Sequence, residues 1–231
     1  MLDVTRTEKK YDIGPLEMAD MKRRLGVFMD SDPHNGEKGY LVRSLYFDTL
    51  SDTDFEEKVE GYDERQKIRL RVYSTDAQTA KLEVKEKTGG FQRKRSLILN
   101  RDEAARMIGG DNRFLSDREE PLARWLYAFL SARCYRPKCM VEYERCALIT
   151  EHNDTRITFD QNLRASESNF DLFCREAMFY SVSPPGMVTM EVKYSGFLFT
   201  YIKNELSRCD KMQISNSKYC RARMISKRGR K

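Results

Sequence analysis

Short segments in which apolar and polar residues alternate dominate the chain. A period of two is typical of β-strands that present one apolar and one polar face. The pattern predicts strands at residues 8–13, 40–47, 67–73, 81–87, 91–99, 138–149, 155–159 and 187–194. The Gly89-Gly90 pair between two of these strands predicts a tight hairpin turn.

Helical periodicity fills the gaps between the strands. Helices are predicted at residues 15–29, 102–108, 121–132 and 198–208, with Asn100 placed to cap the second. Many strands with few inserted helices indicate an α+β fold, and we expect a closed antiparallel β-barrel with a few peripheral helices. The length favours a single domain over residues 1–231, ending in a frayed basic tail at 227–231.

Several predicted strands carry charges along one whole face. Lys67, Arg69 and Arg71 share one face of their strand, opposite Ile68, Leu70 and Val72. The same alternation groups Glu83 with Lys85 and Lys87, Glu8 with Lys10, Tyr143 with Arg145, and Glu191 with Lys193. A half-solvated sheet explains any one such strand. It explains less well why at least five strands carry such faces, most of them cationic and repeatedly including a glutamate.

In a closed barrel these faces would meet across the lumen. Like charges would repel one another there unless water and a long polyanion filled the space. The planar fork of arginine suits phosphate oxygens, and lysine adds point charges. The glutamates would either pair with lysines or ligate a hard divalent cation that bridges phosphates.

Composition narrows the classes of protein without deciding between them. The 231 residues are 40% hydrophobic and 34% charged, and no apolar run approaches the length of a membrane span. Residues 1–10 are charged, unlike a signal peptide, so the cytoplasm is the expected compartment. Six scattered cysteines and two histidines lack the spacing of a structural zinc site. The net charge of +6 suits either a solvated surface or an anionic ligand.

A series of short motifs carries a resemblance to a known family. In order, they are Glu8-Lys9-Lys10-Tyr11, the run from Ser44 to Thr49, the run from Lys67 to Tyr73, Leu82 to Lys87, Lys94-Arg95, Val141 to Arg145, Arg156 to Asp160, Met190 to Lys193, and Ser217-Lys218-Tyr219. Together they resemble the polyphosphate polymerase domain of the vacuolar transporter chaperone family. That family belongs to the triphosphate tunnel metalloenzymes, also called CYTH-like proteins.

The resemblance implies that the γ-phosphoryl group of ATP moves to a growing inorganic polyphosphate chain, with Mn²⁺ or Mg²⁺ as cofactor. It implies catalytic roles for Lys10, Arg69, Arg71 and Arg145, and a metal site at Glu191, Glu8 and Glu83. The implied phosphate ligands are Lys58, Lys67, Lys85, Lys87, Lys94, Tyr143, Arg156, Lys193 and Lys218. The register leaves open whether Lys85 or Lys87 matches the family lysine, and it leaves the place of Lys58 open too.

One position departs from the wider superfamily. Its members begin with Glu-x-Glu-x-Lys, whereas this chain has Arg6 in the first position, before Glu8 and Lys10. The departure favours the polymerase branch, which also lacks the full acidic motif, and it argues against a second, catalytic metal site. A stand-alone, bacterial version is the natural interpretation. The sequence leaves open whether a membrane partner accepts the polymer.

Three other functions remain open. The same tunnel could hydrolyse triphosphate or tripolyphosphate with water as acceptor, or bind polyphosphate without turnover. Nucleic-acid binding is the third, suggested by the Arg65–Arg71 run and the basic C-terminus. We do not expect a nucleic-acid partner, because glutamates interleaved on the cationic faces would repel a phosphate backbone.

Five further side chains have structural explanations. Asp48 and Asp160 could ligate metal, but turn-capping is the commoner role of an aspartate after a strand. Cys139 and Cys146 are expected to be buried thiols, and Trp125 is expected in the core.

Overall fold

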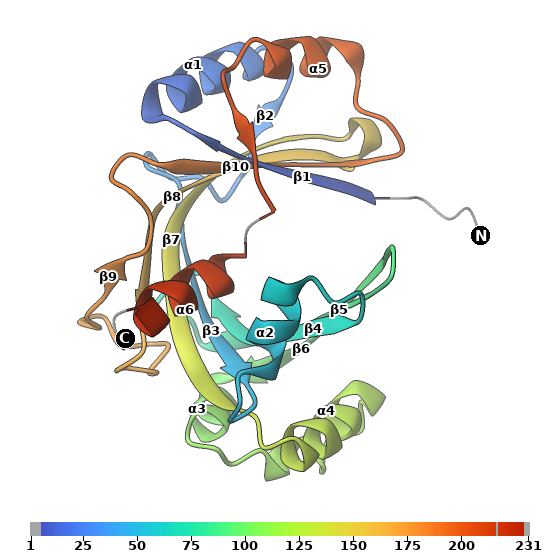
Figure 1. Cartoon of the computed structure of the whole chain (residues 1–231), viewed down its shortest axis with the longest axis vertical. Helices are drawn as coiled ribbons and strands as arrows, with labels where there is room; N and C mark the ends of the chain where they lie inside the picture. The colour runs from blue at the N-terminus through green and yellow to red at the C-terminus, as the bar shows by residue number, and fades with distance from the viewer. Residues whose placement is uncertain (1–5, 216, 229–231) are drawn as a thin grey trace. The chain divides into compact units, whose positions relative to one another are not determined.

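The computed structural model describes residues 6–215 and 217–228. Its strands are β1 (Arg6–Ile13), β2 (Asp30–Ser31), β3 (Tyr40–Asp48), β4 (Arg65–Val72), β5 (Thr79–Thr88), β6 (Phe91–Asn100), β7 (Arg136–Thr150), β8 (Thr155–Ser166), β9 (Tyr180–Ser181), β10 (Val188–Ser195) and β11 (Met212–Gln213). Its helices are α1 (Pro15–Leu25), α2 (Thr53–Glu60), α3 (Arg101–Ile108), α4 (Pro121–Ala132), α5 (Thr200–Ser207) and α6 (Lys218–Arg228), with short 3-10 turns η1 (Arg113–Leu115) and η2 (His152–Asp154). Figure 1 labels most of these elements.

The predicted strands and helices are confirmed, with ends that shift by a few residues in most cases. The largest change is in β8, which continues to Ser166 instead of ending at residue 159. Asn100 caps α3 as expected, in a reciprocal capping box with Glu103. Helices α2 and α6 were not predicted from the sequence pattern.

In the part of the chain that the structure describes, the strands form one large sheet that is not closed by hydrogen bonds. Over the described residues its order is β11-β1-β10-β8-β7-β3-β4-β5-β6, with β2 added beside β7 and β9 beside β8. The closed barrel expected from the sequence is therefore not shown: among the described residues, the terminal strands β11 and β6 pair with β1 and β5 and not with each other. Charged residues such as Arg93 and Lys94 are exposed on β6, which is a common way of keeping an edge strand unpaired.

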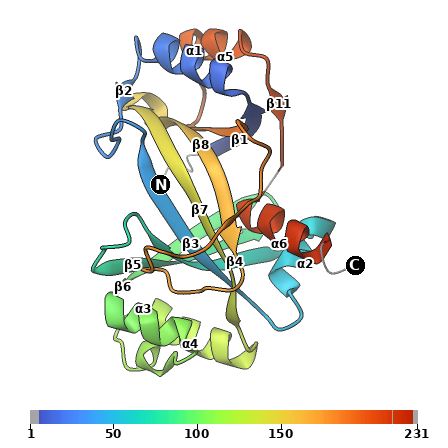
Figure 2. The ribbon, with the colours of Figure 1, turned by 90° about the vertical axis from the view of Figure 1, so that its left-hand side faces the viewer.

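Among the described residues, 6–41, 143–163 and 183–215 make up a first compact unit. Its core lies between the apolar faces of β1, β8 and β10 and the two helices α1 and α5, which lie side by side (Figure 2). Alternate strand residues such as Ile157, Met190 and Val192 fill this core, so their neighbours in sequence emerge on the opposite face.

Residues 42–142, 164–182 and 217–228 make up a second unit with its own core. Here Ile68, Leu70 and Val72 are buried, as the alternation predicts, and α3 and α4 pack against β6. Trp125 of α4 is partly buried against this core and stacks on Phe129. Strands β3, β7 and β8 contribute residues to both units. A single domain over residues 1–231 stays a prediction.

The C-terminal helix α6 runs to Arg228, so Lys227, expected in the frayed tail, is helical and pairs with Asp52. Residues 229–231 of the expected tail lie outside the described residues. Within 6–215 and 217–228, no helix is both long and apolar enough to cross a membrane.

Candidate functional site

Strands β4, β5 and β6 bring cations of the second unit onto one face of the sheet. The register places Arg69 opposite Glu83, Lys67 opposite Lys85, and Lys85 opposite Lys94. We call this set the arginine face: Lys67, Arg69, Arg71, Glu83, Lys85 and Lys94. Lys85 lies between two other lysines of the face, whereas Lys87 lies further along the same strand, opposite Arg65 and Gln92.

Glu83 is the shared counter-charge of the arginine face. Arg69 donates from Nε to Glu83 Oε2 at 2.7 Å, Arg71 Nη1 lies 3.8 Å from the same oxygen, and Lys94 pairs with Oε1. Burial alone would raise the pKa of Glu83, but Arg69, Arg71 and Lys94 lower it to about 2. This carboxylate is only 1% exposed and faces three cations, which favours a counter-charge over the metal ligand expected from the resemblance.

Three cations of the arginine face also donate hydrogen bonds to hydroxyl groups. Arg69 Nη1 donates to the Tyr46 hydroxyl at 3.1 Å, and Arg71 Nε donates to Ser44 Oγ at 3.1 Å. Lys67 Nζ donates to Ser217 Oγ at 2.6 Å. Both β3 residues lie in the run from Ser44 to Thr49 noted in the sequence, but their role depends on how β3 pairs with β4 and could not be seen there.

The remaining predicted phosphate ligands of the second unit lie on helices. Lys58 belongs to α2 and Lys218 begins α6, and these two helices pack against each other. The N-terminus of α2 is held by Asp48, whose carboxylate accepts from the backbone N–H groups of Asp54 and Phe55. The capping role expected for Asp48 is therefore confirmed.

In the first unit, acidic and basic residues alternate across neighbouring strands. The register places Glu8 opposite Lys193 and Lys10 opposite Glu191 across β1 and β10, and Lys193 opposite Arg156 across β10 and β8. We call this set the carboxylate face: Glu8, Lys10, Tyr143, Arg145, Arg156, Asp160, Glu191 and Lys193.

The two predicted metal ligands of this face converge on one cation. Lys193 Nζ lies 2.5 Å from Glu191 Oε1 and 3.8 Å from Glu8 Oε2, and Lys10 Nζ lies 2.7 Å from Glu8 Oε1. Glu8 and Glu191 thus direct carboxylate oxygens toward the same positively charged atom. The Lys193 ammonium group occupies the space between these two carboxylates.

Arg145 is fixed on the carboxylate face by a two-pronged ion pair. Its Nε and Nη2 atoms lie 2.7 and 2.8 Å from the two oxygens of Asp160, and its guanidinium lies 5.3 Å from the Tyr143 ring centroid. Burial would lower the pKa of Arg145, but Tyr143 and Asp160 raise it well above its ordinary value. A side chain at Gly39, whose φ is +95°, would collide with the Arg145 carbonyl, so this strand contact requires glycine.

Arg156 has a separate carboxylate partner. Its Nη2 lies 2.6 Å from Asp32 Oδ2 and donates to the Tyr40 hydroxyl at 2.9 Å. Asp160, interpreted above as a turn cap, instead lies within β8 as the partner of Arg145. The sequence did not reveal Asp32 or Asp160 as counter-charges, because each is remote in sequence from its arginine.

A family model for the VTC domain matches residues 5–227, which is nearly the whole chain. The chain belongs to the VTC domain family. No curated protein matches it closely enough to add to this finding.

Two solved structures share the fold of this VTC domain. A proposed adenylyl cyclase from Hippeastrum, described as having a dominant triphosphatase activity, has a TM-score of 0.56 at 12% identity, over 95% of this chain and 96% of that one. A proposed adenylate cyclase from Bacillus halodurans has a TM-score of 0.50 at 14% identity, over 87% of this chain and 85% of that one. At these identities the likeness shows a shared fold alone.

The carboxylates of this VTC domain fit a divalent metal that is shared with phosphate. Among the described residues, no group of three or more histidine, cysteine, aspartate or glutamate side chains is arranged to hold an ion. Mg²⁺ is commonly held by one or two carboxylates together with substrate phosphates and water. Glu8 and Glu191, converging on a cationic atom, match that donor set.

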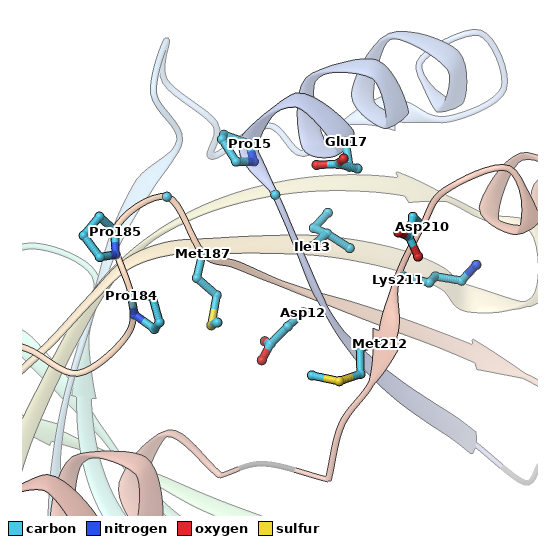
Figure 3. A pocket seen from close by; sticks show the side chains of 12 residues that line it. Asp12, Ile13, Pro15, Glu17, Pro184, Pro185, Met187, Asp210, Lys211 and Met212 are labelled. Carbon is cyan, nitrogen blue, oxygen red and sulfur yellow. The ribbon is translucent and has the colours of Figure 1, made fainter.

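A hollow of about 490 Å³ lies elsewhere in the first unit of the VTC domain, between β1, β11 and the 184–187 turn (Figure 3). Its lining includes Asp12, Glu17 and Asp210. Lys211, the lysine at its edge, donates to the backbone carbonyls of Leu206 and Cys209. This acidic lining does not suit a phosphate chain.

Proposed function

We propose that this VTC domain lengthens inorganic polyphosphate with the γ-phosphoryl group of ATP, using Mn²⁺ or Mg²⁺. The observation that carries the proposal is the arginine face, where Arg69, Arg71 and Lys94 share the carboxylate of Glu83. Such a face attracts a polyanion, and membership of the VTC domain family favours polyphosphate as that polyanion. An ATP-dependent reaction also fits the cytoplasm expected from the sequence.

The proposed reaction transfers one phosphoryl group between two phosphate oxygens. A terminal oxygen of the polyphosphate chain forms a bond to the γ-phosphorus, and the bond from that phosphorus to the β,γ-bridging oxygen breaks. ADP leaves with the electron pair of the broken bond. The attacking phosphate oxygen is already ionised, so no protein group has to remove a proton.

The residues of the arginine face would bind and orient phosphate. Arg69 and Arg71 offer planar forks for phosphoryl oxygens, and their charges oppose the charge that develops during transfer. Lys67, Lys85 and Lys94 extend the cationic surface along neighbouring strands, which suits a linear chain of phosphates.

The carboxylate face would supply the metal ligands. Glu191 and Glu8 would hold the ion, which when bound neutralises phosphate charge and orients the phosphoryl group. Arg145 would contribute a further fixed positive charge. The phosphate-binding roles of Lys10, Lys58, Lys87, Tyr143, Arg156, Lys193 and Lys218 remain part of this proposal.

Hydrolysis of triphosphate is the second candidate function. It is favoured by the similarity in fold to the Hippeastrum protein, which is described as a triphosphatase. The cations of the arginine face would then bind the triphosphate, and water would replace the polyphosphate end as the acceptor.

The test is to incubate the purified protein with ATP and Mn²⁺ and to separate the products on a polyacrylamide gel stained for polyphosphate. A ladder of long chains together with ADP is the expected result. Orthophosphate without chains would move the assignment to a triphosphatase. Tight binding of tripolyphosphate without turnover would leave a non-catalytic binding module.

A further inference from the structure

Tyr46 of β3 is a buried tyrosine in direct contact with Arg69. Its hydroxyl accepts a hydrogen bond from Arg69 Nη1 at 3.1 Å, and the guanidinium carbon lies 5.8 Å from its ring centroid. Glu83 holds the other end of the same guanidinium, at Nε. Two acceptors at different atoms fix both the position and the plane of the arginine fork.

A second tyrosine packs against the ring of Tyr46. The Tyr219 ring of α6 stacks on the Tyr46 ring, with centroids 5.0 Å apart and an interplanar angle of 20°. Its hydroxyl donates to Asp48 Oδ2 at 2.7 Å. Burial and the neighbouring Asp48 carboxylate raise the pKa of Tyr219, so this hydroxyl keeps its proton and remains a donor.

Asp48 is itself fixed by the N-terminus of α2. The backbone N–H groups of Asp54 and Phe55 donate to its two oxygens at 2.9 and 3.0 Å. A continuous series of contacts therefore runs from α2 through Asp48, Tyr219 and Tyr46 to the arginine fork.

We propose that Tyr46, supported by Tyr219, is a positioning residue that holds the Arg69 guanidinium in its phosphate-binding orientation. This inference rests on the proposed phosphoryl-transfer function for its kinetic consequence. The tyrosine acts through Arg69, and its effect should vanish when that arginine is removed.

The charges around Tyr46 provide an independent probe of the contact. Burial raises the pKa of the Tyr46 hydroxyl, but the neighbouring guanidinium groups of Arg69 and Arg71 lower it more, so the net shift is downward. A tyrosine that ionises at a lower pH than usual can be followed by its ultraviolet absorbance, whether or not the protein turns over ATP.

The first test is a double-mutant cycle on tripolyphosphate affinity and on kcat. Tyr46→Phe keeps the ring stack and removes the acceptor, and it is expected to lower both by about tenfold. In an Arg69→Ala background the same change should lower affinity by less than twofold. The same factor in both backgrounds would overturn the proposal. Tyr135→Phe, which removes the hydroxyl of another buried tyrosine that donates to Asp54, is the control and should show no coupling to Arg69.

The second test separates failure of this inference from failure of the proposed function. The difference between the ultraviolet pH titrations of the wild-type protein and Tyr46→Phe isolates the ionisation of Tyr46. It should occur below the ordinary range for tyrosine and move upward in Arg69→Ala. If the protein forms no polyphosphate and this shift is present, the function is wrong and the contact stands. A titration that does not respond to Arg69→Ala would overturn the positioning role.

Discussion

The arginine face and the carboxylate face are both charged strand faces, but they balance their charges differently. On the arginine face, Glu83 is shared by Arg69, Arg71 and Lys94. On the carboxylate face, Arg145 has Asp160 as its own partner. The lysines there alternate with glutamates from one strand to the next.

The same alternation of charged and apolar residues along a strand can therefore produce two faces with different charge balances, and the two balances suit different ligands. A face whose cations share one carboxylate keeps positive potential that favours phosphate oxygens. On the carboxylate face, Glu8 and Glu191 both lie against Lys193, and the proposal is that a metal ion takes the place of this ammonium group when phosphate binds. The proposed division is that the arginine face binds phosphate directly, whereas Glu8 and Glu191 act through the metal.

The largest expected effect comes from shortening an arginine of the arginine face. Arg71→Ala should lower the rate of chain synthesis by roughly a hundredfold or more, because a preorganised charge is lost. Rates are measured from ADP release at saturating Mn²⁺. Arg93→Ala is the control, since Arg93 lies on β6 with its side chain on the opposite face of the same sheet. Equal rates for the two variants would contradict the assignment of the face.

The next effect concerns stability and its dependence on pH. Glu83→Gln should lower the free energy of unfolding by about 2 kcal/mol at pH 7, because three cations lose their shared counter-charge. The folded-state pKa of Glu83 is lowered to about 2 from an ordinary 4.5. Its ionic contribution is therefore fully present above pH 4.5 and is lost as the pH falls toward 2.

Denaturant unfolding of both proteins at several pH values measures this contribution. The gap between wild type and Glu83→Gln should be constant above pH 4.5 and should close toward pH 2. A gap that does not change with pH would show that the carboxylate charge is not the cause.

A smaller effect is expected on the carboxylate face, and it should depend on metal. Glu191→Gln should raise the Mn²⁺ concentration required for half-maximal turnover by roughly tenfold or more. Glu144→Gln is the control, because Glu144 lies on β7 in the same unit and accepts from Asn162. If both variants need the same Mn²⁺ concentration as the wild type, Glu191 is not a metal ligand.

The smallest effect is expected for the most exposed cation of the arginine face. The Lys94 side chain is 49% exposed, so solvent weakens its interaction with phosphate. Lys94→Met should weaken tripolyphosphate binding about threefold at physiological salt, and the loss should shrink as salt rises. Arg93→Met, one residue away and on the opposite face, should leave the affinity unchanged.

The sequence was sufficient for much of the fold because the information was local. Alternation located the eight main strands, and it placed Arg69 and Arg71 opposite Ile68 and Leu70 correctly. Helix α6 escaped notice because its residues 218–228 are mostly charged or polar and form no clear apolar stripe. Closure of the sheet could not be inferred, since it depends on whether β6 and β11 pair, which neither strand's own pattern determines.

For the site residues too, local features could be predicted from the sequence, and contacts between separate segments could not. Cations could be assigned to faces from alternation alone, and Cys139 and Cys146 are buried as expected. The partners could not be assigned, because Asp32 meets Arg156 only after distant segments fold together. Tyr46 was visible as part of a motif, but its contact with Arg69 depends on the pairing of β3 with β4.

The most direct test of the division between the two faces is calorimetric binding of tripolyphosphate, with and without Mn²⁺, to the wild type, Arg71→Ala and Glu191→Gln. The account predicts that Arg71→Ala loses affinity under both conditions. It predicts that Glu191→Gln binds as the wild type does without metal and loses only the gain that Mn²⁺ provides. Equal losses for the two variants in the absence of Mn²⁺ would contradict it.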